Sequence, residues 1–307
     1  MGGVEITSIY GVKGEESKNI EYLSPKWVEM IEHTIAEADK LSMKVDLPPG
    51  SGWRIGGPFI TEDLAASRIL IEIDESANYT AKNQPFDEKV KRPGKGGAGR
   101  SFNPFYKKSV QMITEYYSPV FKSLKVRAQF HDSWEYASNS CPDIFEQFKI
   151  RHGYDFRKYL TDLVSNDSDL MSRIKYDLQV TLSDMALENF ITPWVEWCHS
   201  LGQLTRNQAH GSPGNLLDLY AAVDIPETEV FKGINPDTPI LAKFASSAAH
   251  FMGRNLISSE TGTWLDEHFK VSLSEMKRLI DTLFVSGINH HIYHGTAYLS
   301  LIHISEP

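Results

Sequence analysis

The sequence lacks the features typical of membrane proteins, nucleic-acid-binding proteins and disulfide-stabilised proteins. No stretch of its 307 residues approaches the roughly 20 apolar residues that cross a bilayer, so we expect no membrane partner. With 31 Lys and Arg against 40 Asp and Glu, the net charge is -9, and we expect no nucleic-acid partner because phosphate contacts need a basic face. The two cysteines, Cys141 and Cys198, lack zinc-ligand spacing and cannot build a disulfide framework, so we interpret both as packed thiols.

Aromatic residues, by contrast, are plentiful. Six Trp, thirteen Tyr and fifteen Phe make up 11% of the chain, and many lie in polar segments rather than in apolar runs. Sugar rings stack their C–H faces on aromatic side chains while their hydroxyls bind carboxylates, amides and imidazoles. Core packing accounts for most aromatics in any protein, but this composition also fits a glycan-binding site.

Both ends of the sequence indicate a fragment of a longer chain. No signal peptide is present, and the start runs directly into the alternating stretch Val4 to Tyr10, which predicts a strand. The last residues, 299–307, read LSLIHISEP, which resembles the translation of a sequencing-library adaptor; a genuine terminal strand is the alternative. We therefore expect a metagenomic fragment whose natural sequence ends near Tyr298, and we leave the tail out of the site.

Between these ends, predicted helices and strands alternate. The pattern predicts strands over 4–10, 43–47, 126–130, 203–209, 221–229, 255–260 and 288–294, and helices over 25–41, 104–124, 142–160, 169–200, 214–220, 238–252 and 272–286. Residues 66–104 interrupt the alternation with a strand at 69–73 and a polar, glycine-rich stretch. Because this stretch lacks the GKS or GKT ending of a phosphate loop, we predict a mobile surface insertion.

The predicted strands nearly all finish in a polar cluster. Parallel strands buried on both faces carry their chemistry just beyond their C-terminal ends. A doubly wound sheet shares this alternation but concentrates function at one or two switch points. We therefore predict an α/β fold, a (β/α)8 TIM-like barrel over residues 1–298 with an insertion at about 66–104. About seven strands can be counted, so the barrel is expected to be truncated.

Acidic residues at these strand ends are the candidate catalytic groups: Asp132, Glu135, Glu229 with Glu227, and Glu260. Glycoside hydrolysis needs two carboxyl groups, one to protonate the leaving oxygen and one to activate water or attack carbon. Partial desolvation by Trp134 and Tyr136 would keep Glu135 protonated, as a general acid requires, whereas the hydroxyl-rich surroundings of Glu260 suit an ionised general base. For any single glutamate, a salt bridge or a helix-cap contact is an equally good interpretation.

Other side chains at the same strand ends and in nearby loops are candidate sugar-binding residues. They are Trp53, His131, Asp132, Trp134, Asn207, His210, Trp264, His290 and His294. Carboxylate and amide oxygens gathered at a barrel mouth could also hold Ca²⁺, which takes six to eight oxygen ligands. No EF-hand or zinc-binding pattern supports a metal from spacing alone.

Seven segments together resemble glycoside hydrolase family 106, the α-L-rhamnosidases: GGVEITSIYG, GSGWRIGGPFIT, FHDSWEY, TRNQAHGSPGNLLDLY, VDIPETE, SSETGTWL and GINHHIYHGTAY. The resemblance covers residues 2–298, and the combination is specific although no single motif is. It implies a catalytic (β/α)8 barrel followed by β-sandwich domains that this chain does not include. It also implies an inverting mechanism with calcium at the active site, Glu135 as general acid and Glu260 as general base. By the same resemblance, Glu229 is tied to the calcium or to the attacking water.

The resemblance further implies a substrate and a location. We expect hydrolysis of terminal α-L-rhamnosyl linkages in plant pectic glycans of the rhamnogalacturonan type, by a full-length protein that is periplasmic or secreted. Two alternatives remain: a retaining glycosidase of another barrel family, and a carbohydrate-binding barrel without turnover. Inversion predicts carboxyl groups about 6.5–9.5 Å apart, and retention predicts about 5 Å.

Overall fold

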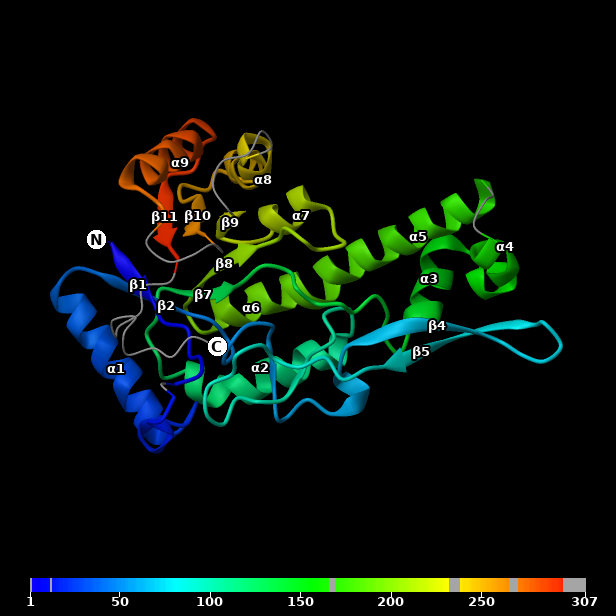
Figure 1. Cartoon of the computed structure of the whole chain (residues 1–307), viewed down its shortest axis with the longest axis horizontal. Coiled ribbons are helices and arrows are strands. Elements are labelled where there is room, and N and C mark those ends of the chain that lie inside the picture. The colour runs from blue at the N-terminus through cyan, green and yellow to red at the C-terminus, as the bar shows by residue number, and fades with distance from the viewer. Residues whose placement is uncertain (1, 12, 166–168, 232–237, 265–269, 295–307) are drawn as a thin grey trace.

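The centre of the molecule is a parallel seven-stranded sheet that curls into a nearly closed barrel (Figure 1). The computed structural model describes residues 2–11, 13–165, 169–231, 238–264 and 270–294, so Tyr298 and the tail 299–307 lie outside the described residues. The strand order is β1 (Gly3–Glu5), β2 (Lys44–Leu47), β7 (Ala128–His131), β8 (Leu204–Gln208), β9 (Ile225–Phe231), β10 (Ser258–Thr263) and β11 (His290–Tyr293). All six neighbouring pairs are parallel. The predicted α/β barrel is confirmed.

Helices follow most of these strands and cover the outside of the barrel (Figure 1). They are α1 (Pro25–Lys40), α2 (Lys107–Phe121), α5 (Asp169–Met185), α6 (Thr192–Ser200), α7 (Leu216–Ala221), α8 (Thr238–Phe251) and α9 (Leu273–Val285). Their starts follow local chemistry: the Ser24 hydroxyl accepts from the backbone N–H of Trp27 at 3.2 Å, and Ser272 forms a capping box with Glu275. Among the described residues, no helix is long and apolar enough to cross a membrane.

Two of the long helices predicted from the sequence are divided. The helix predicted over 142–160 is α3 (Ile144–His152), a 3-10 turn (Phe156–Tyr159) and α4 (Leu160–Ser165). Gly153 ends α3 with a φ of 76°, a left-handed conformation that glycine adopts without strain. In the helix predicted over 169–200, a π-helical segment (Ala186–Ile191) joins α5 to α6. Short 3-10 turns also occur at Glu16–Lys18 and Glu62–Leu64.

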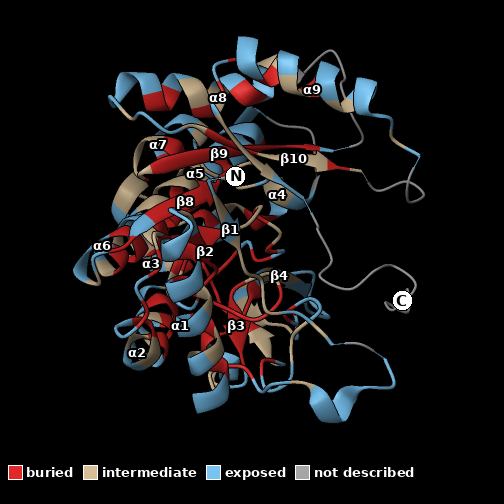
Figure 2. Cartoon of the chain, turned by 90° about the vertical axis from the view of Figure 1, so that its left-hand side faces the viewer, coloured by how far each residue is buried: buried red, intermediate tan, exposed pale blue. Residues whose placement is uncertain are grey.

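The main core lies between the barrel strands and the inward faces of the helices (Figure 2). In α1, Trp27, Ile31 and Ile35 recur at helical spacing and are all buried, while Glu29 and His33 on the other face are exposed. Burying one such side chain contributes about 1.5–3 kcal/mol. Burial of these side chains therefore holds the helices against the outside of the barrel.

Residues 66–104 form an insertion that leaves the barrel, named the excursion. The strand predicted at 69–73 is confirmed within β4 (Ser67–Ile73), which pairs antiparallel with β5 (Tyr79–Pro85) and extends beside α3, α4 and α5 (Figure 1). β3 (Gly56–Gly57) pairs with β6 (Arg100–Ser101). A Cβ added at Gly99 would lie 2.0 Å from the backbone carbon of Gly57, so glycine is required where these two backbones meet.

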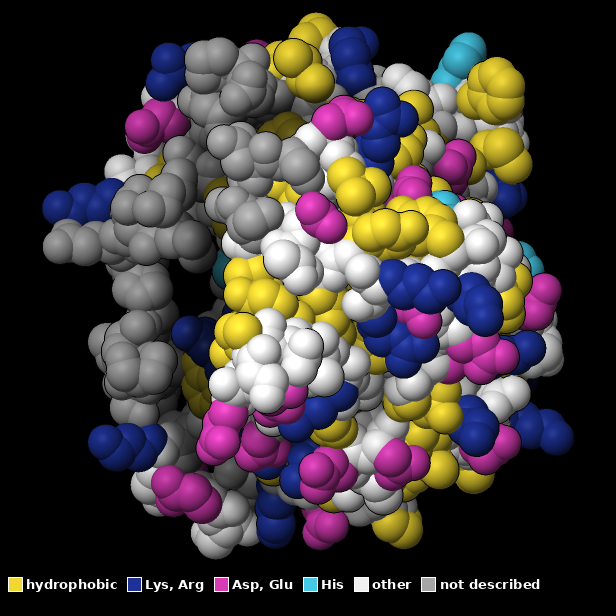
Figure 3. Space-filling view, turned by 90° about the vertical axis from the view of Figure 1, so that its right-hand side faces the viewer, with side chains coloured by type: hydrophobic (Ala, Val, Ile, Leu, Met, Phe, Trp, Pro, Cys, Tyr) yellow, Lys and Arg dark blue, Asp and Glu magenta, His cyan; other side chains and the backbone are white. Residues whose placement is uncertain are grey.

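The far end of this excursion carries a mixed surface. Figure 3 shows acidic and basic side chains interspersed with apolar ones on that face rather than gathered by sign. Exposed ion pairs on this face include Lys82–Glu72 at 2.9 Å in the excursion and Arg173–Asp169 at 2.7 Å in α5. Exposed pairs of this kind are worth at most about 1 kcal/mol, so this end owes little of its order to them.

Candidate active site

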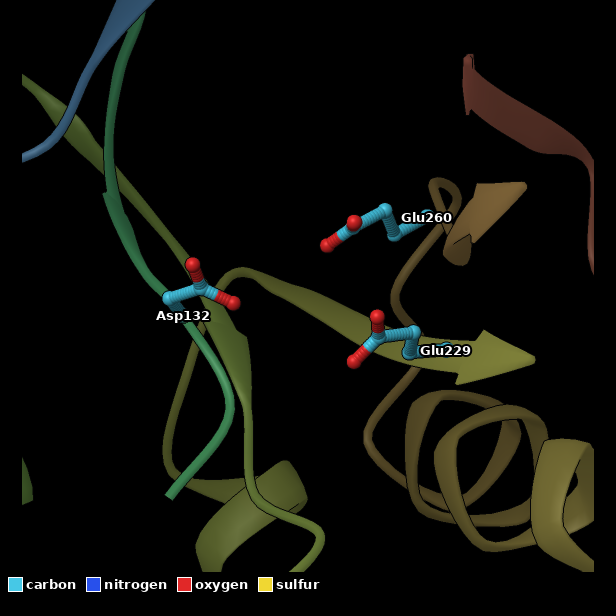
Figure 4. A group of neighbouring side chains, drawn as sticks. All are labelled: Asp132, Glu229 and Glu260. Carbon is cyan, nitrogen blue, oxygen red and sulfur yellow. The ribbon is translucent and has the colours of Figure 1, made fainter. Parts of the chain in front are cut away.

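Three carboxylates converge at the mouth of the barrel (Figure 4). Asp132 directly follows β7, Glu229 lies in β9 and Glu260 lies in β10, and one oxygen from each lies within 4.8 Å of the others. Glu229 and Glu260 are register partners in neighbouring parallel strands, so their side chains leave the sheet on the same face. The strand-end positions predicted from the sequence therefore do meet.

A second polar layer lies one step deeper in the barrel. Glu227 is two residues before Glu229 and so shares its face, and it is fully buried. Its register partners are Gln208 in β8 and Ser258 in β10. Arg206, also fully buried, places its guanidinium Nη1 3.1 Å from Glu227 Oε2. The interior of the barrel is therefore polar at this depth, and its charges are paired.

The convergence changes how two of the three carboxyl groups hold protons. Burial raises the pKa of Glu229 to about 9, and the neighbouring charge of Glu260 adds to the rise. Burial and the same neighbour also raise the pKa of Asp132 well above its usual value. Like charges this close cannot all be ionised without compensation. At neutral pH the three groups must share protons or a cation.

Glu260 is held by hydrogen-bond donors on both oxygens. The amide Nε2 of Gln208 donates to Oε2 at 2.8 Å, and the hydroxyl of Thr263 donates to Oε1 at 3.0 Å. His294 places Nε2 3.7 Å from Oε1. These donors fix the orientation of the carboxylate. The hydroxyl-rich setting expected for Glu260 is thus supplied by Thr263, whereas Ser258 donates to Glu227 instead.

Glu135 lies on the loop after β7, and its surroundings differ from those expected. The side chain is 32% exposed, and Lys91 from the excursion places Nζ 2.5 Å from its Oε2. Trp134 and Tyr136 do not shield it from water as expected, because both rings are buried in the main core. The charge of Glu135 nevertheless contributes to the raised pKa of Glu229, which places it near the carboxylate cluster.

The loop that carries Glu135 is hydrogen-bonded to the excursion and to the segment around β3. The backbone N–H of Ala137 donates to Glu88 Oε1 at 3.0 Å, and the backbone N–H of Ile55 donates to the Tyr136 hydroxyl at 3.1 Å. Glu88 also pairs with Arg54 at 3.2 Å. The excursion predicted as a surface insertion therefore contributes to the site.

Two residues predicted to bind sugar lie away from the carboxylates. His131 Nδ1 lies 2.6 Å from Asn207 Oδ1, and both side chains are buried beneath the helical layer. Burial lowers the pKa of His131 to about 4, so the ring is neutral. Phe190 packs edge-on against the same ring. The structure does not bring this pair to the site, and the geometry gives no support to a sugar-binding role.

The three predicted tryptophans have different surroundings. Trp134 is buried against Phe105 and Phe190 and supports the loop rather than offering an open face. Trp53 is half-buried with the guanidinium of Arg92 5.3 Å from its ring. Trp264 is partly buried beneath α9, against a small core cluster of Val230, Ala242, Leu279, Leu283 and Ile288. Trp53 and Trp264 are thus both half-buried, and the loop of Trp53 pairs with Lys91, the partner of Glu135.

The remaining predicted histidines surround the cluster at different depths. His210 places Nε2 3.2 Å from Glu229 Oε2, and burial lowers its pKa. His294 is exposed beside Glu260. His290 lies deeper, 3.4 Å from the Arg127 guanidinium, and burial together with that positive charge lowers its pKa to about 4. His210 and His294 are brought to the site, and His290 lies beneath it.

Sequence reasoning missed two contacts of the candidate catalytic pair. Gln208 touches Glu260, and a signal existed, because Arg206 and Gln208 alternate as polar residues in a strand that must be buried. Lys91 touches Glu135, and no local signal could have found it. Its segment reads as an ordinary polar loop 44 residues away in the chain.

The carboxylate cluster suits a hard divalent cation. Asp132, Glu229 and Glu260 offer only oxygen ligands, which Ca²⁺ prefers, and among the described residues no Lys or Arg lies within ion-pair distance of Asp132 or Glu229. A bound cation would remove the repulsion that raises the pKa of Asp132 and Glu229. The residues present therefore fit the calcium that the family resemblance implies.

Comparison with known families agrees with this geometry. Residues 98–303 match the model of the glycoside hydrolase family 106 proteins, described as alpha-L-rhamnosidase. The chain belongs to this family. The matched region includes the Glu135 loop, β9 and β10, so all four candidate carboxylates fall within it.

Individual relatives of this family 106 chain are more distant. A Formosa agariphila protein provisionally named a beta-glucuronidase is 27% identical over 173 residues, which are 53% of this chain and 14% of that protein. The solved rhamnosidase from Novosphingobium sp. PP1Y superposes with a TM-score of 0.77 at 13% identity, over 97% of this chain and 52% of that one. A beta-galactosidase from the psychrophilic Marinomonas ef1 gives 0.55 at 13% identity, over 99% and 52%. These structures show the shared fold, and this chain spans about half the length of each.

Proposed function

We propose that this chain carries the catalytic barrel of an inverting α-L-rhamnosidase. In this proposal Glu135 is the general acid and Glu260 the general base for hydrolysis of terminal α-L-rhamnosyl linkages. The observation that carries the proposal is the meeting of Glu260 with Asp132 and Glu229 at the barrel mouth, with Glu135 on the adjoining loop. Family membership supplies the reaction class.

The proposed reaction is a single displacement by water. The water oxygen attacks the anomeric carbon while the bond from that carbon to the leaving oxygen breaks. Glu260 takes a proton from the water, and Glu135 gives a proton to the leaving oxygen. One water is consumed, and solvent restores both carboxyl groups to their starting states. Each proton transfer of this kind is worth about 10²- to 10⁴-fold in rate.

We further propose that Asp132 and Glu229 hold Ca²⁺ in the working enzyme, beside Glu260, which stays free to act as the base. Their converging oxygens and the raised pKa of Glu229 and Asp132 support this assignment. When bound, the ion would neutralise the cluster and provide a Lewis-acidic contact for the vicinal hydroxyls of rhamnose. His210 and His294, beside the same carboxylates, are positioned to contact further hydroxyls.

The guanidinium of Arg92 supports a pectic substrate in this proposal. Arg92 lies 5.6 Å from the ring of Tyr10 and 5.3 Å from that of Trp53, and among the described residues it has no carboxylate partner. It follows Lys91, whose ammonium contacts Glu135. Because Glu135 would protonate the leaving sugar, Arg92 borders the leaving-group side. A guanidinium there suits the carboxylate of a uronic acid in a rhamnogalacturonan-type glycan.

The full-length protein is proposed to be periplasmic or secreted, with β-sandwich domains following the barrel. Polymeric pectic glycans do not enter a bacterial cell intact, which supports an exported enzyme. The solved relatives are about twice as long as this chain, which leaves room for additional domains.

The experiment that tests the proposal compares Glu135→Gln and Glu260→Gln on aryl α-L-rhamnosides. Both should lose about 10²-fold or more in kcat/KM with a poor leaving group. Glu135→Gln should recover activity with a dinitrophenyl leaving group, which needs no proton, and Glu260→Gln should not. Glu196→Gln, exposed on α6, is the matched control and should keep full activity. Full activity in either catalytic variant would refute the assignment.

A further inference from the structure

Gln208 connects two carboxylates at different depths of the barrel. Its side chain is fully buried at the end of β8. The amide nitrogen Nε2 donates to Glu227 Oε1 at 3.0 Å and to Glu260 Oε2 at 2.8 Å. Glu227 is the deeper of the two, and Glu260 is the candidate base. One amide group therefore connects the buried carboxylate of Glu227 to Glu260 at the barrel mouth.

The direction of this amide is fixed by the two carboxylates. An amide nitrogen carries two protons, so Gln208 can donate to both acceptors at once. The opposite orientation would place its carbonyl oxygen against two carboxylates and lose both bonds. Oε1 of Gln208 is buried and finds no hydrogen-bond partner among the described residues. A buried carbonyl oxygen without a partner costs folding free energy. In this orientation the cost is offset by the two hydrogen bonds that Nε2 donates to the carboxylates.

The deeper carboxylate cannot move. Glu227 accepts from the Ser258 hydroxyl at 2.5 Å and pairs with Arg206 at 3.1 Å, and all three side chains are fully buried. Arg206 is itself enclosed: it contacts Glu5 and lies 4.1 Å over the ring of Phe130. Glu227 is thus a fixed point, and its role is separate from that of the carboxylates at the mouth.

We propose that Gln208 is a positioning residue that sets the orientation of Glu260 from the fixed Glu227. This inference rests on the proposed function. Gln208 holds Oε2 of Glu260, and Thr263 holds Oε1. A carboxylate oxygen has two lone pairs, so one on each oxygen stays available for the attacking water. The carboxylate is held in one orientation before substrate arrives, as a base that must meet a water within hydrogen-bond reach requires.

The kinetic test is Gln208→Leu, which keeps the volume and removes both donors. kcat on 4-nitrophenyl α-L-rhamnoside should fall by on the order of 10²-fold with KM nearly unchanged, because misplacing a catalytic group affects the chemical step. The loss should be the same with a dinitrophenyl leaving group, since water attack, not leaving-group protonation, is impaired. Gln129→Leu is the matched control: this glutamine is also fully buried in a strand but donates to Gln203, away from the site.

An equal loss in Gln129→Leu, or a rise in KM without a fall in kcat, would overturn the inference. A second measurement does not need activity. The two side-chain amide protons of Gln208, assigned by their absence in Gln208→Leu, should exchange slowly in ¹H–¹⁵N spectra, and each should shift when its own partner, Glu227 or Glu260, becomes Gln. Fast exchange, or no response to Glu260→Gln, would reject the positioning role. If the unmodified chain hydrolyses no rhamnoside, the proposed function fails and these spectra still decide the inference.

Discussion

The ammonium of Lys91 lies 2.5 Å from a carboxylate oxygen of Glu135. The two residues are 44 positions apart, and the contact joins the excursion to the loop that carries the candidate acid. This ion pair fixes where the carboxyl group of Glu135 lies on its loop before substrate binds.

Replacing Lys91 by Gln should therefore lower kcat/KM on aryl α-L-rhamnosides with a poor leaving group, by up to about 10²-fold, because the candidate acid is no longer held in place. With a dinitrophenyl leaving group, which needs no proton, the loss should be small. Lys89→Gln is the matched control, because Lys89 pairs with exposed Asp87 instead. Full activity in Lys91→Gln, or an equal loss with both leaving groups, would contradict this role.

Calcium should stabilise the chain through the carboxylate cluster. At a free concentration of 100 times the Kd, an ion that binds only the folded state adds about 2.7 kcal/mol to the free energy of unfolding. We expect Tm to rise with Ca²⁺, to rise less with Mg²⁺ and to return with a chelator. Glu229→Gln, which removes one ligand charge, should weaken the effect, and Glu196→Gln should not. A Ca²⁺ response that is unchanged in Glu229→Gln would place the ion elsewhere.

Arg206 should be essential for stability although it touches no substrate. It is fully buried among Glu5, Asp46 and Glu227, and its removal would leave buried carboxylates without a counter-charge. Arg206→Met should lower the free energy of unfolding by about 3–5 kcal/mol. Arg173→Met, at an exposed ion pair, should change it by no more than about 0.5 kcal/mol. Urea denaturation measures both, and a stable Arg206→Met variant would show that the buried charges are not coupled as described.

The sequence predicted the barrel and the meeting of its acidic strand ends because both follow from local rules. Strands that alternate with helices form a parallel sheet, and their C-terminal ends share one edge. Asp132, Glu229 and Glu260 could be placed together from these rules alone, and the structure agrees.

His131 lies elsewhere than its strand-end position alone suggests. It ends a strand, as Asp132 nearly does, but side chains alternate along a strand. Phe130 contacts Arg206 inside the barrel, whereas His131 turns outward to Asn207 and Phe190. The period of two was visible in the sequence. Applying it to FHDSWEY would have separated Asp132 from His131.

The excursion could not have been predicted in the same way. Its glycines indicate a mobile loop when considered locally, yet Gly97 is buried and Gly99 meets the backbone of Gly57. Lys91 reaches Glu135 only because of that packing. Contacts made between distant backbones leave no periodic signal, so this half of the site required the structure.

The most direct test of the proposed function is the configuration of the first sugar released. Hydrolysis of 4-nitrophenyl α-L-rhamnoside by the unmodified chain, followed by ¹H NMR within the first minutes, distinguishes the two anomers before they equilibrate. An inverting enzyme that uses Glu135 as acid and Glu260 as base must release β-L-rhamnose first. Initial release of α-L-rhamnose would contradict the account, because it requires a glutamate or aspartate nucleophile in place of the activated water.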